Sequence, residues 1–146
     1  MALKLLIVLT ICSAIIIGNN GQREGDDEEV DNNVYQSLGS LPTYAHGLSG
    51  QVFADLSDRE LRTVRIKHLY YDGAAPDAYF WAGNSDKPDT TGFIIPDENG
   101  LRKPLKGYTD ADIVLKLPSG KTLNDIKWLA VWCRRYRENF GNVNLV

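Results

Sequence analysis

A single cysteine near the C-terminus is the residue best suited to chemistry in this 146-residue chain. Cys133 lies between a tryptophan-rich apolar run and a basic turn that contains Arg134 and Arg135. The other cysteine, Cys12, belongs to an N-terminal apolar segment. Secreted domains normally pair their cysteines, so a thiol left alone after loss of that segment requires burial, an intermolecular bridge or a chemical role.

The run before Cys133 has the character of a buried β-strand. Alternation along this strand places Trp128 and Trp132 on one face and Cys133 on the other. Positive charge favours the thiolate, so we expect Arg134 and Arg135 to make Cys133 ionise more readily than a free cysteine. Cys133 is therefore the candidate redox group or ligand, with the two tryptophans as walls of the site. An inert core thiol and an intermolecular disulfide remain open as alternatives.

The other potential ligands limit which cofactors Cys133 could hold. A thiolate ligates haem iron or copper, and both normally require further protein ligands. The chain has only His46 and His68, and its one methionine is Met1. His68 alternates with apolar strand positions, which predicts a packed histidine rather than a ligand. Haem or copper through Cys133 therefore stays an open possibility, the cofactor is undetermined, and no metal site is predicted.

The two parts of the chain before residue 41 are not expected to belong to the folded domain. Residues 1–21 resemble a secretory signal, because Lys4 precedes the apolar stretch Leu5–Gly18, which is shorter than the about 20 residues that span a bilayer. Residues 22–40 are acidic at their start and are interpreted as a disordered tail or pro-segment. We expect a secreted, extracellular protein without a membrane span in its mature form.

The folded domain is expected at residues 41–146, with an all-β fold. Short β-like runs separated by turn residues predict an antiparallel β-sandwich, jelly-roll-like, with at most one short helix, at Asp55–Leu61. The net charge of −3 shows no basic excess, so no nucleic-acid partner is predicted. The expected strands are 50–54, 63–68, 77–82, 92–96, 111–117, 126–133 and 139–146.

Several ordered motifs together resemble one known family, the DM-thirteen domain of Skeletor-type animal proteins. The resemblance covers about 100 residues, essentially the whole expected domain. Members often carry the domain in tandem or beside a DOMON domain, whereas this sequence has a single copy. The motifs are Gly47–Val52, Tyr70–Gly73, Pro76–Gly83, Ile95–Gly100, Pro104–Leu105, Leu123–Trp128, Val131–Cys133 and Asn139–Gly141.

The resemblance implies an extracellular β-sandwich with a proposed redox or electron-transfer role. It implies that Cys133 acts either as a bare thiol or as a cofactor ligand. We expect an accessory redox or binding module rather than a stand-alone enzyme. The alternative is a non-catalytic matrix or adhesion module, with Cys133 packed in the core and with extracellular-matrix or cell-surface proteins as partners.

Overall fold

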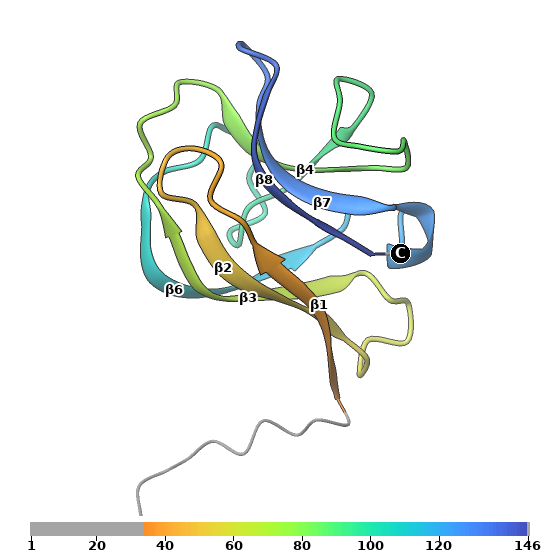
Figure 1. The fold of residues 1–146 in the computed structure, drawn as a ribbon. Coiled ribbons are helices and arrows are strands. Elements are labelled where there is room, and N and C mark those ends of the chain that lie inside the picture. The colour runs from red at the N-terminus through yellow and green to blue at the C-terminus, as the bar shows by residue number, and fades with distance from the viewer. Residues whose placement is uncertain (1–33, 146) are drawn as a thin grey trace, which may run out of the picture.

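The computed structural model describes residues 34–145, which form two packed four-stranded sheets (Figure 1). One sheet has the strand order β1-β2-β3-β6 and the other has the order β5-β4-β7-β8. All neighbouring strands are antiparallel. The expected all-β antiparallel sandwich is thus confirmed. The strands are β1 Tyr35–Leu41, β2 Ser49–Asp55, β3 Thr63–Tyr71, β4 Ala78–Gly83, β5 Phe93–Ile95, β6 Tyr108–Lys116, β7 Trp128–Cys133 and β8 Glu138–Asn144.

The strands that alternate in sequence also alternate in burial. In β3, Val64 and Ile66 are fully buried while Arg65 is partly exposed. Ile113 and Leu115 are the corresponding buried residues of β6, and they lie opposite Ile66 and Val64. Apolar side chains on one face of each strand therefore meet those of the other sheet, and the core lies between the two sheets.

The two central strands of the second sheet are buried on both faces. Every residue of β4 and of β7 is buried. The inner face packs against the other sheet, and the outer face packs beneath the β4–β5 connection. Two indole N–H groups hold this connection, since Trp81 donates to the carbonyl of Asp89 at 2.9 Å and Trp128 donates to that of Ser85 at 3.0 Å.

The first strand, β1, was not predicted. It extends the folded part of the chain to residues before the expected start at residue 41. The expected tail ended at residue 40, but Tyr35–Leu41 form β1 and pair with β2. A bulge interrupts this pairing between Ser37 and Gly39. The strand lies at the border of its sheet and is mostly exposed, so its sequence lacks the apolar alternation that marks a half-buried strand. The expected signal at residues 1–21 and the acidic run up to residue 33 lie outside the described residues.

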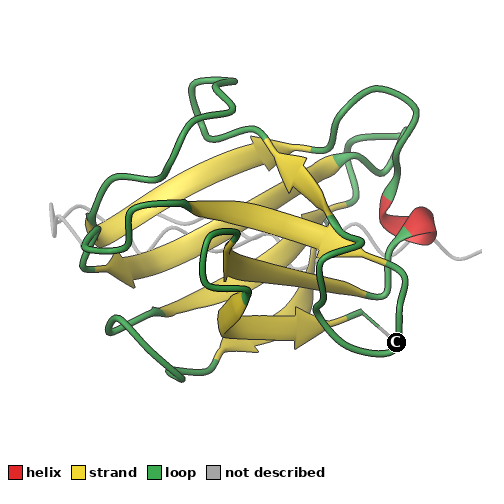
Figure 2. Ribbon diagram, turned by 90° about the horizontal axis from the view of Figure 1, so that it is seen from above, coloured by secondary structure: helices red, strands yellow, loops and turns green. Residues whose placement is uncertain are grey.

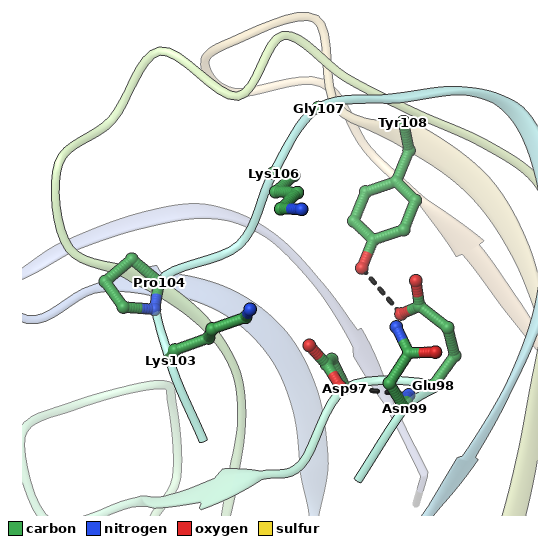
Figure 3. Close-up of a pocket in the computed structure, with 8 residues that line it drawn as sticks. All are labelled: Asp97, Glu98, Asn99, Lys103, Pro104, Lys106, Gly107 and Tyr108. Atoms are coloured by element: carbon green, nitrogen blue, oxygen red, sulfur yellow. Dashed lines mark hydrogen bonds between the residues drawn. The ribbon is translucent and has the colours of Figure 1, made fainter. Parts of the chain in front are cut away.

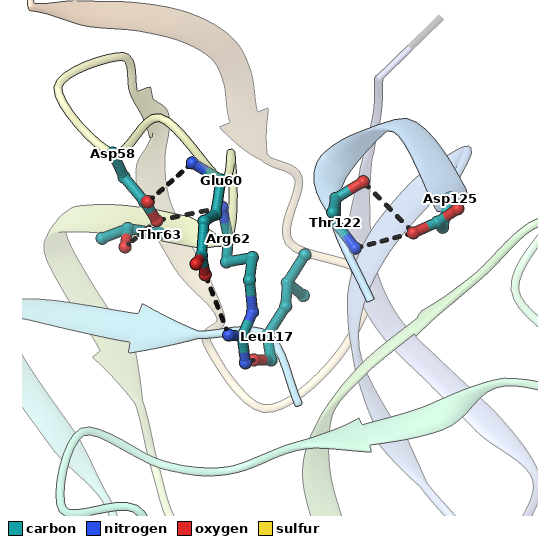
Figure 4. Close-up of polar contacts among 7 residues, drawn as sticks. All are labelled: Asp58, Glu60, Arg62, Thr63, Leu117, Thr122 and Asp125. Carbon is teal, nitrogen blue, oxygen red and sulfur yellow. Dashed lines mark hydrogen bonds and ion pairs between the residues drawn. The ribbon is translucent and has the colours of Figure 1, made fainter. Parts of the chain in front are cut away.

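The helix expected at Asp55–Leu61 is wrong, because that segment forms turns. Asp58 organises it instead, accepting hydrogen bonds from the backbone N–H groups of Glu60 and Arg62 (Figure 4). Turn aspartates offer the backbone this alternative to helical hydrogen bonds. The hydroxyl of Thr63 lowers the pKa of the Asp58 carboxyl, and the backbone bond from Arg62 adds to this.

A one-turn 3-10 helix, Leu123–Asp125, occurs before β7 instead (Figure 2). Thr122 and Asp125 cap it reciprocally, with the Asp125 carboxylate accepting the Thr122 N–H at 2.8 Å (Figure 4). Beside this cap, Arg62 donates to the carbonyl of Leu117 at 2.9 Å and so ties the β2–β3 connection to the end of β6. This end of the sandwich, where β7 begins, is closed by polar contacts between turns.

His68 is not packed as expected, because β3 carries a bulge. The pairing with β6 shifts between Ile66 and Leu69, so Leu69 takes the buried position. His68 adopts a φ of 52° and points outward, with Nδ1 2.7 Å from the Asp110 carboxylate. The side chain of Asp112 accepts the backbone N–H of His68 at 2.9 Å. A bulge that reverses one side chain in this way leaves no mark in the apolar pattern.

Candidate functional site

Cys133 is the last residue of β7, and its side chain is sealed inside the sandwich. It lies opposite Ala78 of β4 and Glu138 of β8. Its exposed fraction is 0%, and it belongs to the cluster of apolar residues between the two sheets. No disulfide joins it to another residue within the described part of the chain.

The two tryptophans lie on the opposite face of β7 from the thiol. Trp128, Ala130 and Trp132 form an outer cluster with Tyr79 and Trp81. Leu129, Val131 and Cys133 point into the core between the sheets. The predicted alternation is therefore correct, but it also means that the two indoles do not wall the thiol, as the sequence interpretation proposed.

The basic turn after β7 also points away from the thiol. The guanidinium carbon of Arg134 lies 5.5 Å from the centre of the Tyr79 ring, on the tryptophan side of the sheet. Its backbone N–H donates to the carbonyl of Asp77 at 3.0 Å. Arg135 is exposed. The structure thus places both arginines next to Cys133 in the chain without bringing either guanidinium into the core.

A tyrosine hydroxyl that sequence reasoning missed shares this part of the core with Cys133. Tyr71, at the end of β3, is only 3% exposed, and its hydroxyl is buried without a hydrogen-bond partner. Burial raises the pKa of Tyr71, and the negative charge of Asp72 raises it further. The N–H of Ala75 acts in the opposite direction, although it does not complete a hydrogen bond. An unpartnered buried hydroxyl is rare, since its desolvation is not offset.

Tyr71 lies in the same core cluster as the buried thiol and close to a histidine–aspartate contact at the surface. His46 Nδ1 lies 3.0 Å from Oδ2 of Asp72, and its ring centre is 6.1 Å from that of Tyr71. The ring of Phe140 packs against both, at 4.3 Å from His46 and 6.2 Å from Tyr71. The N–H of Ala74 lowers the pKa of Asp72, and His46 adds to this effect.

The β1–β2 connection contains His46, and its backbone hydrogen bonds fix the position of this residue. Figure 1 shows the course of the connection between the two strands. The N–H groups of Tyr44 and Ala45 both point to the carbonyl of Phe140, and the carbonyl of His46 accepts the N–H of Asp72 at 3.1 Å. His46 adopts a φ of 57°, an uncommon conformation for a residue with a side chain. Gly141 permits the close approach, because a Cβ there would collide with the carbonyl of Pro42.

Neither haem nor copper fits around Cys133. Haem requires an open cavity beside its ligand, and the thiol is enclosed by apolar side chains. Copper sites require several ligands together, and residues 34–145 contain no group of three or more His, Cys, Asp or Glu residues that could hold a metal ion. The residues present therefore favour a bare thiol.

A polar pocket formed by residues 97–108 has its carboxylates already engaged (Figure 3). It encloses about 210 Å³. The Asp97 carboxylate accepts the N–H groups of Asn99 and Leu101, each at 2.9 Å, and the hydroxyl of Tyr108 donates to Glu98 at 2.7 Å. Burial raises the pKa of Tyr108, and the Glu98 contact adds to the rise. These contacts stabilise the turn and do not leave a free acid–base pair.

The fold and the thiol together define a class of protein, a single β-sandwich module with a buried, unpaired cysteine. The model of the family described as "Electron transfer DM13" matches residues 40–145. The chain therefore belongs to the DM13 family, and the expected resemblance is confirmed.

Two curated relatives match the same part of the chain. Protein Skeletor of Drosophila melanogaster, isoforms B/C, is 44% identical over 110 residues, which is 74% of this chain and 14% of the relative. Isoforms D/E are also 44% identical over 110 residues, and there the match is 7% of the relative. The chain thus spans a small part of these relatives. No solved structure matches.

Proposed function

We propose that this chain is an extracellular redox module in which Cys133 is the electron-carrying group, as a bare thiol. The observation that carries this proposal is that one core cluster contains both an unbridged thiol and the unpartnered hydroxyl of Tyr71. Apolar packing alone does not account for a buried hydroxyl without a partner. The description of the family as one of electron transfer supports the same reading.

The chemistry is thiol–disulfide exchange with a disulfide of a partner molecule. The Cys133 thiol loses its proton to solvent, and its sulfur attacks one sulfur of the disulfide. A new S–S bond forms, the old one breaks, and the second sulfur leaves as a thiolate with the electron pair. Cys133 is thereby oxidised and the partner is half reduced. A second thiolate then attacks the partner's sulfur in this mixed disulfide, a new S–S bond forms between those two sulfurs, and Cys133 leaves as a thiolate that takes up a proton from solvent.

This exchange requires local opening, because Cys133 is fully buried. The part that would open is the β1–β2 connection, which is held by the His46–Asp72 hydrogen bond and by two N–H groups that point to the carbonyl of Phe140. Both side chains of this contact are partly exposed, so it is weaker than the core contacts beneath it. Opening with a free energy below that of global unfolding is common in connections of this kind.

Native-state labelling with a small aromatic disulfide tests the proposal. Cys12→Ser leaves Cys133 as the only thiol of the full chain, and Cys133→Ala in the same background is the blank. We expect labelling without denaturant, and faster labelling in His46→Ala and Asp72→Asn. If labelling instead follows global unfolding across a urea series, Cys133 is a structural core residue and the redox proposal fails.

The second candidate function is a non-catalytic matrix or adhesion module, which the complete burial of Cys133 favours. In that case Cys133→Ala keeps partner binding and loses only stability. Both proposals include an extracellular location and matrix or cell-surface partners. That location and those partners are inferred from the signal-like character of residues 1–21. Among residues 34–145, no helix is long and apolar enough to cross a membrane.

A further inference from the structure

An open groove of about 470 Å³ lies on the outer face of the β5-β4-β7-β8 sheet. Strands β7 and β8 supply Trp132 and a row of three asparagines, which we call the amide row. The loops around it supply further polar and aromatic side chains. The amide row is Asn139, Asn142 and Asn144, and the surrounding residues that matter are Tyr44, Lys87 and Arg137.

A bulge in β8 brings the amide row together. Val131 pairs with Gly141 and Trp132 pairs with Asn139, so Phe140 is an extra residue in β8. In a regular strand, Asn139 and Asn142 would face opposite sides of the sheet. The extra residue turns Phe140 into the core and Asn139 outward, onto the face that carries Asn142 and Asn144. Bulges commonly redirect a side chain beside a functional site.

The amide row presents hydrogen-bond donors to the groove. Asn139 donates to the side-chain oxygen of Asn142 at 2.8 Å, and Asn142 donates to that of Asn144 at 3.0 Å. The oxygen of Asn139 accepts the N–H of Gly141 at 3.0 Å. Each side-chain oxygen therefore already accepts a bond, whereas every amide retains at least one N–H without a partner in the row.

Other residues of the groove add further hydrogen-bond donors to those of the amide row. Lys87 and Arg137 add positively charged donors, opposed by the single carboxylate of Asp86. Tyr44 is 64% exposed at the border of the groove, and Trp132 lies at its floor. Aromatic rings offer a flat apolar surface on which the C–H face of a sugar ring can rest. The ligand chemistry that fits is a ring with an apolar face and negatively charged acceptors.

The bulge explains only one of the three asparagines. The side-chain oxygen of Asn139 accepts a hydrogen bond from the backbone N–H of Gly141 in the bulge. Asn142 and Asn144 have no such task, and asparagine is depleted in β-strands. Two asparagines on one face of β8 therefore point to a use at the surface.

We propose that this groove binds an acidic polysaccharide, with the amide row, Lys87 and Arg137 donating to its carboxylate or sulfate groups and Tyr44 stacking on a sugar ring. The site lies on the face of β7 opposite Cys133 and is independent of the redox proposal. If the protein has no disulfide-exchange activity, the proposal that this groove binds a polysaccharide is unaffected.

Binding of the full chain to heparin, hyaluronan and a neutral cellulose oligosaccharide tests the proposal by calorimetry. We expect binding to at least one acidic chain, weakened by salt because the contacts are charged and partly exposed. Asn142→Ala combined with Asn144→Ala is expected to lower the affinity about tenfold or more, as loss of hydrogen bonds to charged groups predicts. Tyr44→Ala is expected to lower it as well.

Matched controls separate the groove from general charge attraction. Asn124→Ala and Arg59→Ala remove the same residue types from exposed positions outside the groove, and we expect the affinity to stay within twofold of the wild type. Asn142→Asp keeps the side-chain shape but replaces the donor with a carboxylate, so acidic chains should no longer bind. Equal loss in Arg59→Ala and Arg137→Ala would overturn the proposal. So would binding of the neutral chain alone, or no binding at all.

Discussion

The two faces of β7 show how one strand can present two chemically different surfaces. The inner face buries Leu129, Val131 and Cys133 in the core between the sheets. The outer face buries Trp128 and Trp132 beneath a connection that hydrogen-bonds to the indoles of the cluster. On the outer face the indole N–H groups of Trp81 and Trp128 have hydrogen-bond partners, whereas in the core on the inner side the hydroxyl of Tyr71 has none. The core on the inner side of β7 therefore contains a buried polar group without a hydrogen-bond partner, whereas these two indoles on the outer face are hydrogen-bonded.

The largest effect is expected on the tryptophan face. Trp128 is fully buried and its ring packs closely over Gly83. Trp128→Ala should lower the free energy of unfolding by about 3–5 kcal/mol through loss of buried area and the remaining cavity. Chemical denaturation measures this. Tyr136→Ala, at a residue 64% exposed, is the control and should change stability by no more than about 0.5 kcal/mol.

A moderate effect is expected at the thiol. Cys133→Ser puts a hydroxyl among apolar side chains and should destabilise the protein by about 1–3 kcal/mol. Cys133→Ala should lower the unfolding midpoint in urea by less than Cys133→Ser does, because alanine adds no polar atom. If serine is tolerated as well as alanine, water reaches this position, and the contrast between the two faces of β7 is smaller than the structure indicates.

A smaller effect of opposite sign is expected at Tyr71. Tyr71→Phe removes a desolvated hydroxyl without a partner, so stability should stay equal or rise by up to about 1 kcal/mol. Tyr79→Phe is the matched change on the outer face, where Asp77 and Arg134 are polar neighbours of the hydroxyl. That variant should lose stability. A clear loss in Tyr71→Phe would mean that its hydroxyl has a partner.

The smallest effect is a pH dependence at Asp72. Its pKa is lowered in the folded state by the N–H of Ala74 and by His46, so the charged form is favoured on folding. This contribution is present above the ordinary aspartate pKa of about 3.9 and is lost as the pH falls through the lower folded value. Unfolding curves of wild type and Asp72→Asn should therefore differ at pH 7, begin to converge below about pH 4 and meet only below the lowered folded pKa. A difference that is unchanged at pH 2 would contradict this.

Strand positions were predictable where apolar residues alternate, and bulges were not. Val64 and Ile66, like Trp128 and Cys133, follow simple alternation, and the predicted faces are correct. His68 was placed on the wrong face because a bulge reverses it without changing residue types. The first strand was missed because a border strand with polar residues has no apolar pattern.

The sequence was sufficient to identify Cys133 as the candidate residue. It was not sufficient to predict which side chains surround it in the fold. Cys133 was identified from cysteine pairing rules, but the core cluster that encloses it combines residues from both sheets, such as Tyr71 of β3, that are far away in sequence. His46 and Tyr71 meet only because the sheets stack and the loop crosses Phe140. The adjacency of His46 to Gly47 in a turn was the only local signal, and it specifies a backbone conformation rather than a partner.

The bulge in β8 also affects how readily the protein associates with other chains. β8 is the last strand of its sheet, and a last strand offers free backbone groups to which another chain can add. The extra residue at Phe140 breaks the even spacing of those groups, and the hydrophilic asparagines make the exposed side unattractive to an apolar strand. At high protein concentration, this irregularity would help the domain to stay separate from its neighbours instead of polymerising through its sheets.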